Sequence, residues 1–200
     1  MTDRMAGEEG LIAYFGYGSL VNAATHRTDI VAMHPARLKG WRRVWRHRPD
    51  LPDFEAALLS VRRDENAMID GLLVVDHARN LPALDEREKG YHRHLVSYED
   101  FEILSGATID YPIYVYEVMT DLPRSPLESA ITQSYLDAVM QGFFTIHGEE
   151  GVRRFVETTD GFDEMPLHLD RAAPRYPRSV TLSDHEALFF DTMLSPLWKR

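Results

Sequence analysis

An apolar segment that runs directly into two glycines is the feature that most constrains how this chain folds. Residues 11–15 read Leu-Ile-Ala-Tyr-Phe, which favours a buried β-strand. The segment that follows consists of Gly16, Tyr17, Gly18, Ser19 and Leu20. Glycine permits positive φ and lets another group approach the backbone closely. The turn therefore either presents N–H groups to an anionic or carbonyl oxygen, or is a tight turn without a ligand.

Composition and charge narrow the class of protein. The 200 residues suffice for a hydrophobic core, and we expect residues 1–200 to form one domain. The net charge of −10 disfavours nucleic acid as the main partner, and the absence of cysteine excludes disulfides, thiolate zinc sites and a cysteine nucleophile. The N-terminal residues contain no signal-peptide core and no run is long enough to span a membrane. We therefore expect a cytoplasmic protein without a membrane partner.

Strands are predicted mainly in the first part of the chain. Residues 56–61 and 69–75 are apolar and flank a polar stretch, a pattern typical of a hairpin. Further strands are expected within residues 91–98 and 110–119, where apolar and polar residues alternate in part.

Helices are predicted in the later part. Residues 125–128, Ser-Pro-Leu-Glu, form a capping box that opens a helix, for which Gly142 is a candidate stop. A second helix is expected at residues 149–157, and a last one begins at a capping box formed by Ser183 and Glu186. Strands followed by helices predict a single α+β domain.

The segment 37–48 mixes arginine with Trp41 and Trp45. Such a mixture can bind RNA by stacking bases on the rings. The commoner explanation is a strand at the rim of a sheet, with its arginines solvated or paired with carboxylates.

A short helix is predicted from Leu81 to Glu88, ended by Gly90. At about 100° per residue, Glu88 falls on the same face as Leu81 and Leu84, whereas Glu86 falls well away from it. A carboxylate on an apolar face must be paired, raised in pKa or used in catalysis. Glu88 is therefore either a buried ion-pair partner of an arginine or a catalytic residue.

Two motifs, in this order, resemble the gamma-glutamylcyclotransferase-like superfamily, including its ChaC branch. The first is Tyr-Gly-Ser-Leu at residues 17–20, and the second is Leu-Asp-Glu-Arg-Glu-Lys-Gly-Tyr at residues 84–91. The likeness covers about residues 11–145 and leaves residues 146–200 as a helical C-terminal extension. It implies an α+β fold with a small mixed β-barrel flanked by helices.

The resemblance also implies roles for individual residues. Glu88 falls where the family has its general acid/base. Tyr135 resembles a tyrosine that lines the family's pocket, and the alternative is a core tyrosine on an apolar helical face. The loop that holds the γ-glutamyl group is represented by Tyr17, Gly18, Ser19 and Leu20.

The implied activity is that of a γ-glutamyl cyclotransferase. The α-amine of a γ-glutamyl compound, such as glutathione, closes a five-membered ring on its own γ-carbonyl and releases 5-oxoproline and a free amine. One carboxylate can take the proton from the attacking amine and deliver it to the leaving amine. N–H groups of the Gly18 turn would stabilise the oxyanion. Neither a metal nor an organic cofactor is required.

Other assignments stay open at this point. His92 and His94 lie on one side of a predicted strand and could begin a metal site, but no third ligand is evident nearby. Arg171, Arg175 and Arg178 either close over a substrate carboxylate or belong to a proline-spaced tether. The chain could also be a non-catalytic module that binds a γ-glutamyl-like small molecule.

Overall fold

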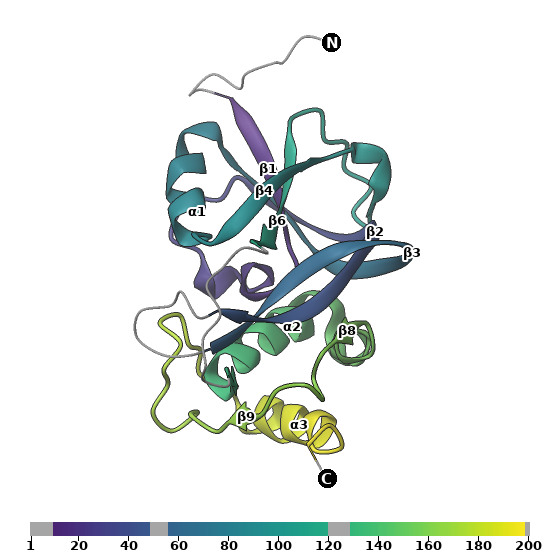
Figure 1. Ribbon diagram of the computed structural model, residues 1–200. Helices are drawn as coiled ribbons and strands as arrows, with labels where there is room; N and C mark the ends of the chain where they lie inside the picture. Colours follow the sequence, from purple (N-terminus) through teal and green to yellow (C-terminus); the bar gives the residue numbers. More distant parts are fainter. Residues whose placement is uncertain (1–9, 49–55, 120–128, 199–200) are drawn as a thin grey trace.

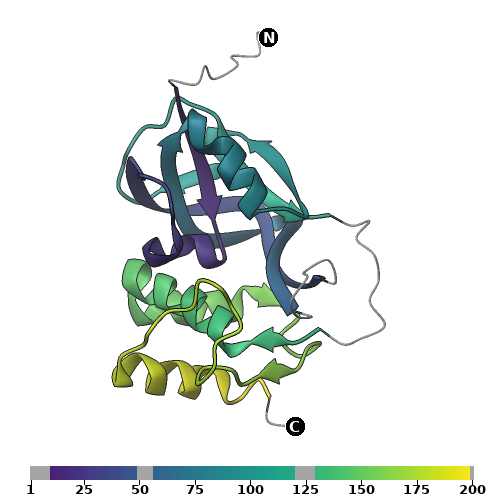
Figure 2. The same ribbon diagram turned by 90° about the vertical axis from the view of Figure 1, so that its left-hand side faces the viewer.

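The computed structural model describes residues 10–48, 56–119 and 129–198. Figures 1 and 2 show a twisted sheet with α1 packed against it, and a layer containing α2 and α3 beneath the β2–β3 ribbon. The strands are β1 (Leu11–Gly16), β2 (Ala32–Arg48), β3 (Ala56–His77), β4 (Tyr91–Val96), β5 (Phe101–Ile103), β6 (Ile113–Val118), β7 (Ile131–Thr132), β8 (Thr159–Asp160) and β9 (Leu167–His168). The α-helices are α1 (Leu81–Arg87), α2 (Gln133–Glu157) and α3 (Asp184–Leu194), and the 3-10 helices are η1 (Ser19–Val21), η2 (Ala23–Thr25), η3 (Ala78–Asn80) and η4 (Tyr98–Asp100).

The main sheet confirms the α+β class and corrects the expected barrel. Its strand order is β4-β6-β1-β3-β2-β5, with β8 beside β2. Most pairs are antiparallel, whereas β1 pairs with β6 and β2 pairs with β8 in parallel. Within the described residues no ladder joins β4 to β5, since β4 pairs with β6 and the three-residue β5 pairs with β2. The described sheet is therefore not closed, and the expected small mixed β-barrel is not supported.

Strand β3 also corrects the predicted hairpin. Residues 56–61 and 69–75 belong to one strand, and both segments pair with β2 instead of with each other. The register between the two strands shifts between Lys39 and Trp41 of β2, which pair with Met68 and Arg63, so residues 64–67 of β3 have no paired residue in the ladder. Strand β2 therefore provides the hydrogen-bond partners that the two segments were expected to provide for each other in a hairpin.

Helix α2 passes through Gly142 without ending there, so the predicted stop is wrong. A Cβ atom at Gly142 would lie 2.8 Å from the backbone nitrogen of Asn22, and the glycine is needed for this close approach. The helix kinks at Gly148, which has a φ of 67°, and the predicted helix at residues 149–157 is the part after this kink. The capping box predicted at residues 125–128 lies outside the described residues.

One hydrophobic core joins the sheet to the helices. Ile12 of β1, Val74 of β3, Phe143 of α2 and Phe190 of α3 are all fully buried in it. The capping box of α3 is present as predicted, with the Ser183 hydroxyl accepting from the N–H of Glu186. No helix in the described part of the chain is long and apolar enough to cross a membrane.

Candidate functional site

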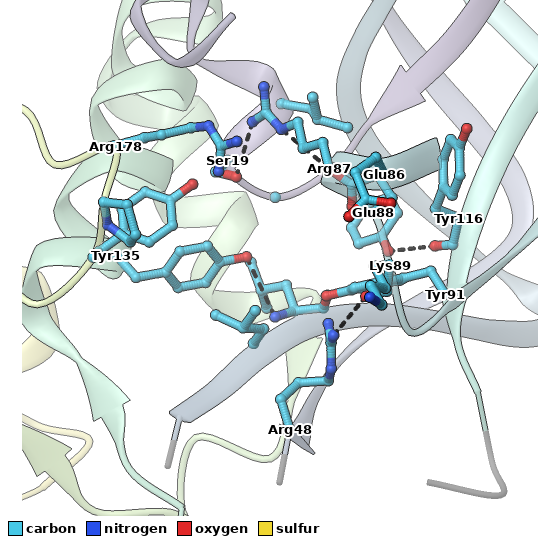
Figure 3. A pocket seen from close by; sticks show the side chains of 17 residues that line it. Ser19, Arg48, Glu86, Arg87, Glu88, Lys89, Tyr91, Tyr116, Tyr135 and Arg178 are labelled. Atoms are coloured by element: carbon cyan, nitrogen blue, oxygen red, sulfur yellow. Dashed lines mark hydrogen bonds and ion pairs between the residues drawn. The ribbon is translucent and has the colours of Figure 1, made fainter. Parts of the chain in front are cut away.

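A cavity of about 620 Å³ lies where β3, the turn after β1, the end of α1 and the C-terminal segment meet. This volume falls within the range typical of small-molecule sites. The cavity brings together all of the predicted site residues, which come from distant parts of the sequence (Figure 3). They are Tyr17, Gly18, Ser19, Leu20, Glu88 and Tyr135.

A buried arginine, Arg43, holds the turn after β1 in place. Nε of Arg43 donates to the carbonyl oxygen of Tyr17 over 2.8 Å, and the Tyr17 hydroxyl donates to the carbonyl oxygen of Tyr116. Arg43 is fully buried, and its guanidinium carbon lies 4.9 Å from the ring centre of Phe143 and 5.0 Å from that of Phe155. These contacts fix the turn to the core.

Gly18 is required for close packing and not for a left-handed backbone. Its φ is −119°, and Gly16 also lacks a positive φ, which corrects the reason given from the sequence. A Cβ atom at Gly18 would lie 2.9 Å from the hydroxyl oxygen of Tyr135 and 3.5 Å from Cβ of Leu59. Within the described residues, the N–H groups of Gly18, Ser19 and Leu20 donate to no protein acceptor.

Glu88 is the residue directly after α1, where the backbone is no longer helical. Its φ of −94° and ψ of 26° are not helical, and its side chain is only 14% exposed. Burial raises the pKa of the Glu88 carboxyl, while the positive charges of Arg87, Arg178 and Arg48 oppose this rise. Glu88 thus combines a partly desolvated carboxylate with a place in the cavity wall.

Glu86 does not lie away from the site as the helical periodicity predicted. It also lines the cavity, although its side chain is exposed. The end of a short helix faces the cavity, so neighbouring positions reach it from several directions. Glu86 is therefore unsuitable as a remote control for Glu88.

Arg87 connects the two sequence motifs, a role that the sequence analysis missed. Its Nε lies 3.3 Å from Oε1 of Glu88, and its Nη2 lies 3.5 Å from the hydroxyl oxygen of Ser19. The guanidinium also donates to the carbonyl oxygen of Thr25 over 2.8 Å and to its hydroxyl over 3.0 Å. Arg87 is part of the second motif, but nothing in the local pattern distinguishes it from a solvated arginine.

Tyr135 lies on α2 and contacts a backbone edge of β3. Its hydroxyl oxygen accepts from the N–H of Leu59 over 3.3 Å, and the carbonyl oxygen of Leu59 accepts from the hydroxyl of Tyr91 over 3.0 Å. The Tyr135 ring packs edge-on against Tyr176 and Trp45, with centroids 5.0 Å and 5.9 Å away. Tyr135 is buried in the core and also lines the cavity. The core role and the pocket-lining role that the sequence left open are therefore compatible.

The C-terminal segment supplies three further lining residues, Tyr176, Pro177 and Arg178. Figure 3 shows the Arg178 side chain pointing into the cavity on the side of Ser19. Arg48 enters from the end of β2, where it donates to the carbonyl oxygen of Lys89 over 2.7 Å and stacks on Tyr91. Of these residues, only Arg178 was named from the sequence as a candidate contact to substrate.

The RNA-binding and metal-binding alternatives receive no support from the side-chain positions. Trp41 and Trp45 are each 1% exposed, so their rings are not available for stacking on bases. Nε2 of His94 lies 3.1 Å from a Glu117 carboxylate oxygen, and the rings of His92 and His94 are 6.3 Å apart. The described residues contain no group of three or more histidine, aspartate or glutamate side chains suited to hold a metal ion.

Comparisons with known proteins bear on the family and the fold of this chain. The family model described as "Gamma-glutamyl cyclotransferase, AIG2-like" matches residues 14–133. A solved structure named "Gamma-glutamyl cyclotransferase" is 15% identical, with a TM-score of 0.56 over 91% of this chain and 99% of that one. An uncharacterized human protein is 16% identical, with a TM-score of 0.55 over 92% and 98%.

A third similar structure is YkqA from Bacillus subtilis. It is 20% identical, with a TM-score of 0.53 over 79% of this chain and 56% of that one. At these identities the structural likeness establishes the fold alone. No curated protein sequence matches the chain.

Proposed function

We propose, since this chain belongs to the gamma-glutamyl cyclotransferase, AIG2-like family, that it cyclises a γ-glutamyl amide or peptide to 5-oxoproline with release of a free amine. The observation that carries the proposal is the position of Glu88. Its carboxylate shares one small-molecule cavity with the Gly18 turn, although the two motifs are far apart in the sequence.

Glu88 is proposed as the general acid/base. The α-ammonium of the substrate must lose a proton before its nitrogen attacks the γ-carbonyl, and the leaving nitrogen must gain one. A carboxylate whose pKa is raised by burial accepts a proton more readily at neutral pH than an exposed one does. The C–N bond formed in the ring replaces the C–N bond broken, so no water is consumed.

The turn at residues 18–20 is proposed to bind the oxygen of the reacting carbonyl. Its three N–H groups have no protein acceptor among the described residues, and donors fixed in advance stabilise the charge of a tetrahedral intermediate. Arg87 contacts both the turn and Glu88, so it holds the donors and the acid/base in one arrangement. Tyr135 closes the side of the cavity next to Gly18.

The ion pair between Arg87 and Glu88 is also what a purely structural role predicts. Arg87 itself lines the cavity, however, so the pair forms part of the wall and not a remote support. A non-catalytic module would bind a γ-glutamyl compound without converting it.

The decisive experiment is mass-spectrometric detection of 5-oxoproline from the purified full chain with a panel of γ-glutamyl compounds, glutathione included. Time-dependent 5-oxoproline and an equal amount of the free amine support the proposal. Saturable binding without any 5-oxoproline would overturn it in favour of the binding module.

A further inference from the structure

Residues 170–178, here called the C-terminal strap, are fastened to α2 by two anchors. The Asp170 carboxylate accepts from the N–H of Ser134 over 2.7 Å and from its hydroxyl over 2.6 Å. Arg171 forms a two-point ion pair with Asp137, over 2.7 Å and 2.9 Å, and a further contact of 2.8 Å with Asp191 of α3. The Asp137 side chain is only 3% exposed, so this ion pair is largely screened from water.

The anchors at Asp170 and Arg171 hold the strap so that its other end, residues 176–178, lies in the cavity wall. The N–H of Tyr176 donates to the Ser134 hydroxyl over 3.1 Å, and the Tyr176 ring packs against Tyr135. Pro177 and Arg178 then complete the cavity wall. This wall lies outside the residues matched by the family model, so it is a feature of this chain that the family match leaves undescribed.

Arg178 differs from the arginine at the other end of the strap. Arg171 is satisfied by two carboxylates, whereas no carboxylate within the described residues forms an ion pair with Arg178. Arg178 is half-buried and lines the cavity, so its charge acts both on Glu88, whose pKa it lowers, and on whatever the cavity binds. A guanidinium matches a carboxylate in both charge and hydrogen-bond geometry.

We propose that Arg178 is a specificity-determining residue that binds a carboxylate on the leaving amine, so that the enzyme favours γ-glutamyl amino acids and peptides over γ-glutamyl derivatives of uncharged amines. This inference rests on the proposed function and adds the substrate class to it. Glu88 and the Gly18 turn are assigned to the reacting atoms. The strap supplies a further wall beside Ser19 and within electrostatic reach of Glu88, and we assign it to the part of the substrate beyond the scissile bond.

The test compares two substrates that differ by one carboxylate, γ-glutamylalanine and γ-glutamylethylamide. For the native protein we expect kcat/KM to be about 10- to 100-fold higher for γ-glutamylalanine, the range of a charge-assisted hydrogen bond. Arg178→Gln should remove this preference by lowering kcat/KM for γ-glutamylalanine much more than for γ-glutamylethylamide, while any change that it causes at Glu88 affects both substrates alike. Arg178→Lys should keep part of the preference. Arg175→Gln is the matched control, because Arg175 is exposed on the same strap and does not line the cavity.

Each outcome has one meaning. Equal kcat/KM for the two substrates in the native protein overturns the inference and leaves the proposed function standing. An equal loss for both substrates in a folded Arg178→Gln protein also overturns it, because Arg178 would then act through Glu88 or bind the glutamyl part. Failure of the native protein to release 5-oxoproline from either substrate, or from the wider panel, overturns the proposed function and this inference with it.

Discussion

Nε of Arg87 lies 3.3 Å from Oε1 of Glu88, so the arginine of the second motif is the ion-pair partner of the carboxylate that follows it in the chain. The same guanidinium reaches Ser19 and Thr25, beyond the first strand. The geometry therefore couples the proposed acid/base to the turn that is proposed to bind the substrate.

Glu88→Gln should lower kcat by about 10²–10⁴-fold, because an amide cannot shuttle a proton at neutral pH. KM should change far less, since binding is assigned to the turn and the cavity walls. Rates of 5-oxoproline release and a thermal melt of the same sample provide the measurement.

Glu102→Gln is the matched control for this variant. Glu102 forms an ion pair with Arg37 over 3.4 Å, is 46% exposed and does not line the cavity. Normal turnover in a folded Glu88→Gln protein would remove Glu88 from the mechanism. Unfolding of that variant would return Glu88 to a structural ion pair.

The pH dependence should report the raised pKa of Glu88. The carboxylate must be ionised to accept a proton, so kcat/KM should fall on the acid side with a midpoint above the ordinary glutamate pKa of about 4.3. A midpoint at or below that value in the native protein, or the same acid limb in Glu88→Gln, would contradict this assignment.

Stability should follow the same titration with a defined sign. The raised pKa means that the folded state holds the proton more tightly, so the free energy of unfolding decreases as pH rises from about 4.3 through the folded pKa. Glu88→Gln should therefore be stabilised relative to the native protein at pH 7, and this gain should disappear below about pH 4. Denaturant unfolding of both proteins at the two pH values is the measurement.

Gly18→Val should impair turnover severely in a protein that still folds. A Cβ atom there lies 2.9 Å from the Tyr135 hydroxyl oxygen, and the Tyr135 ring is packed against Trp45 and Tyr176, so it has little room to withdraw. Gly18→Ala should be less affected, and Tyr135→Phe should reduce the loss of thermal stability caused by Gly18→Ala. If the valine variant is folded and has ordinary kinetics, the turn does not bind the substrate.

Activity should survive exhaustive chelation, because the proposed reaction needs only proton transfer and oxyanion stabilisation. The assay is 5-oxoproline release before and after treatment with a chelator, followed by addition of zinc or manganese. Activity that is lost and then returns with either metal would redirect attention to His92 and His94.

Arg171→Met should destabilise the protein by about 1–3 kcal/mol, the cost of leaving the buried Asp137 carboxylate without its partner. Glu149→Gln is the control, because it removes an exposed ion pair with Arg153 that contributes little. Denaturant unfolding measures both. A change within about 0.5 kcal/mol for Arg171→Met, comparable to a surface pair, would show that the strap is not anchored by this ion pair.

Features that depend on neighbouring residues could be predicted from the sequence. The strand before Gly16 and the capping box at Ser183 follow from local composition and hydrogen bonding, and both are present. The two motifs were sufficient to identify the family. Helical periodicity predicted that Glu88 faces inward, and its side chain is partly buried, although its backbone lies just beyond the end of the helix. The strand and the capping box are stabilised by interactions among a few adjacent residues, so the local sequence is enough to predict them.

The tertiary structure decided which distant segments meet. The pairing of β3 with β2 replaced the predicted hairpin, because a long partner strand satisfies backbone groups that a local turn would leave exposed. The same long-range packing brought Glu86 to the cavity, since helical periodicity does not say what lies beyond the end of a helix. Arg171 and Arg178 look alike in the sequence, yet one is bound by Asp137 and the other faces the cavity, because only the fold determines which carboxylates come within reach.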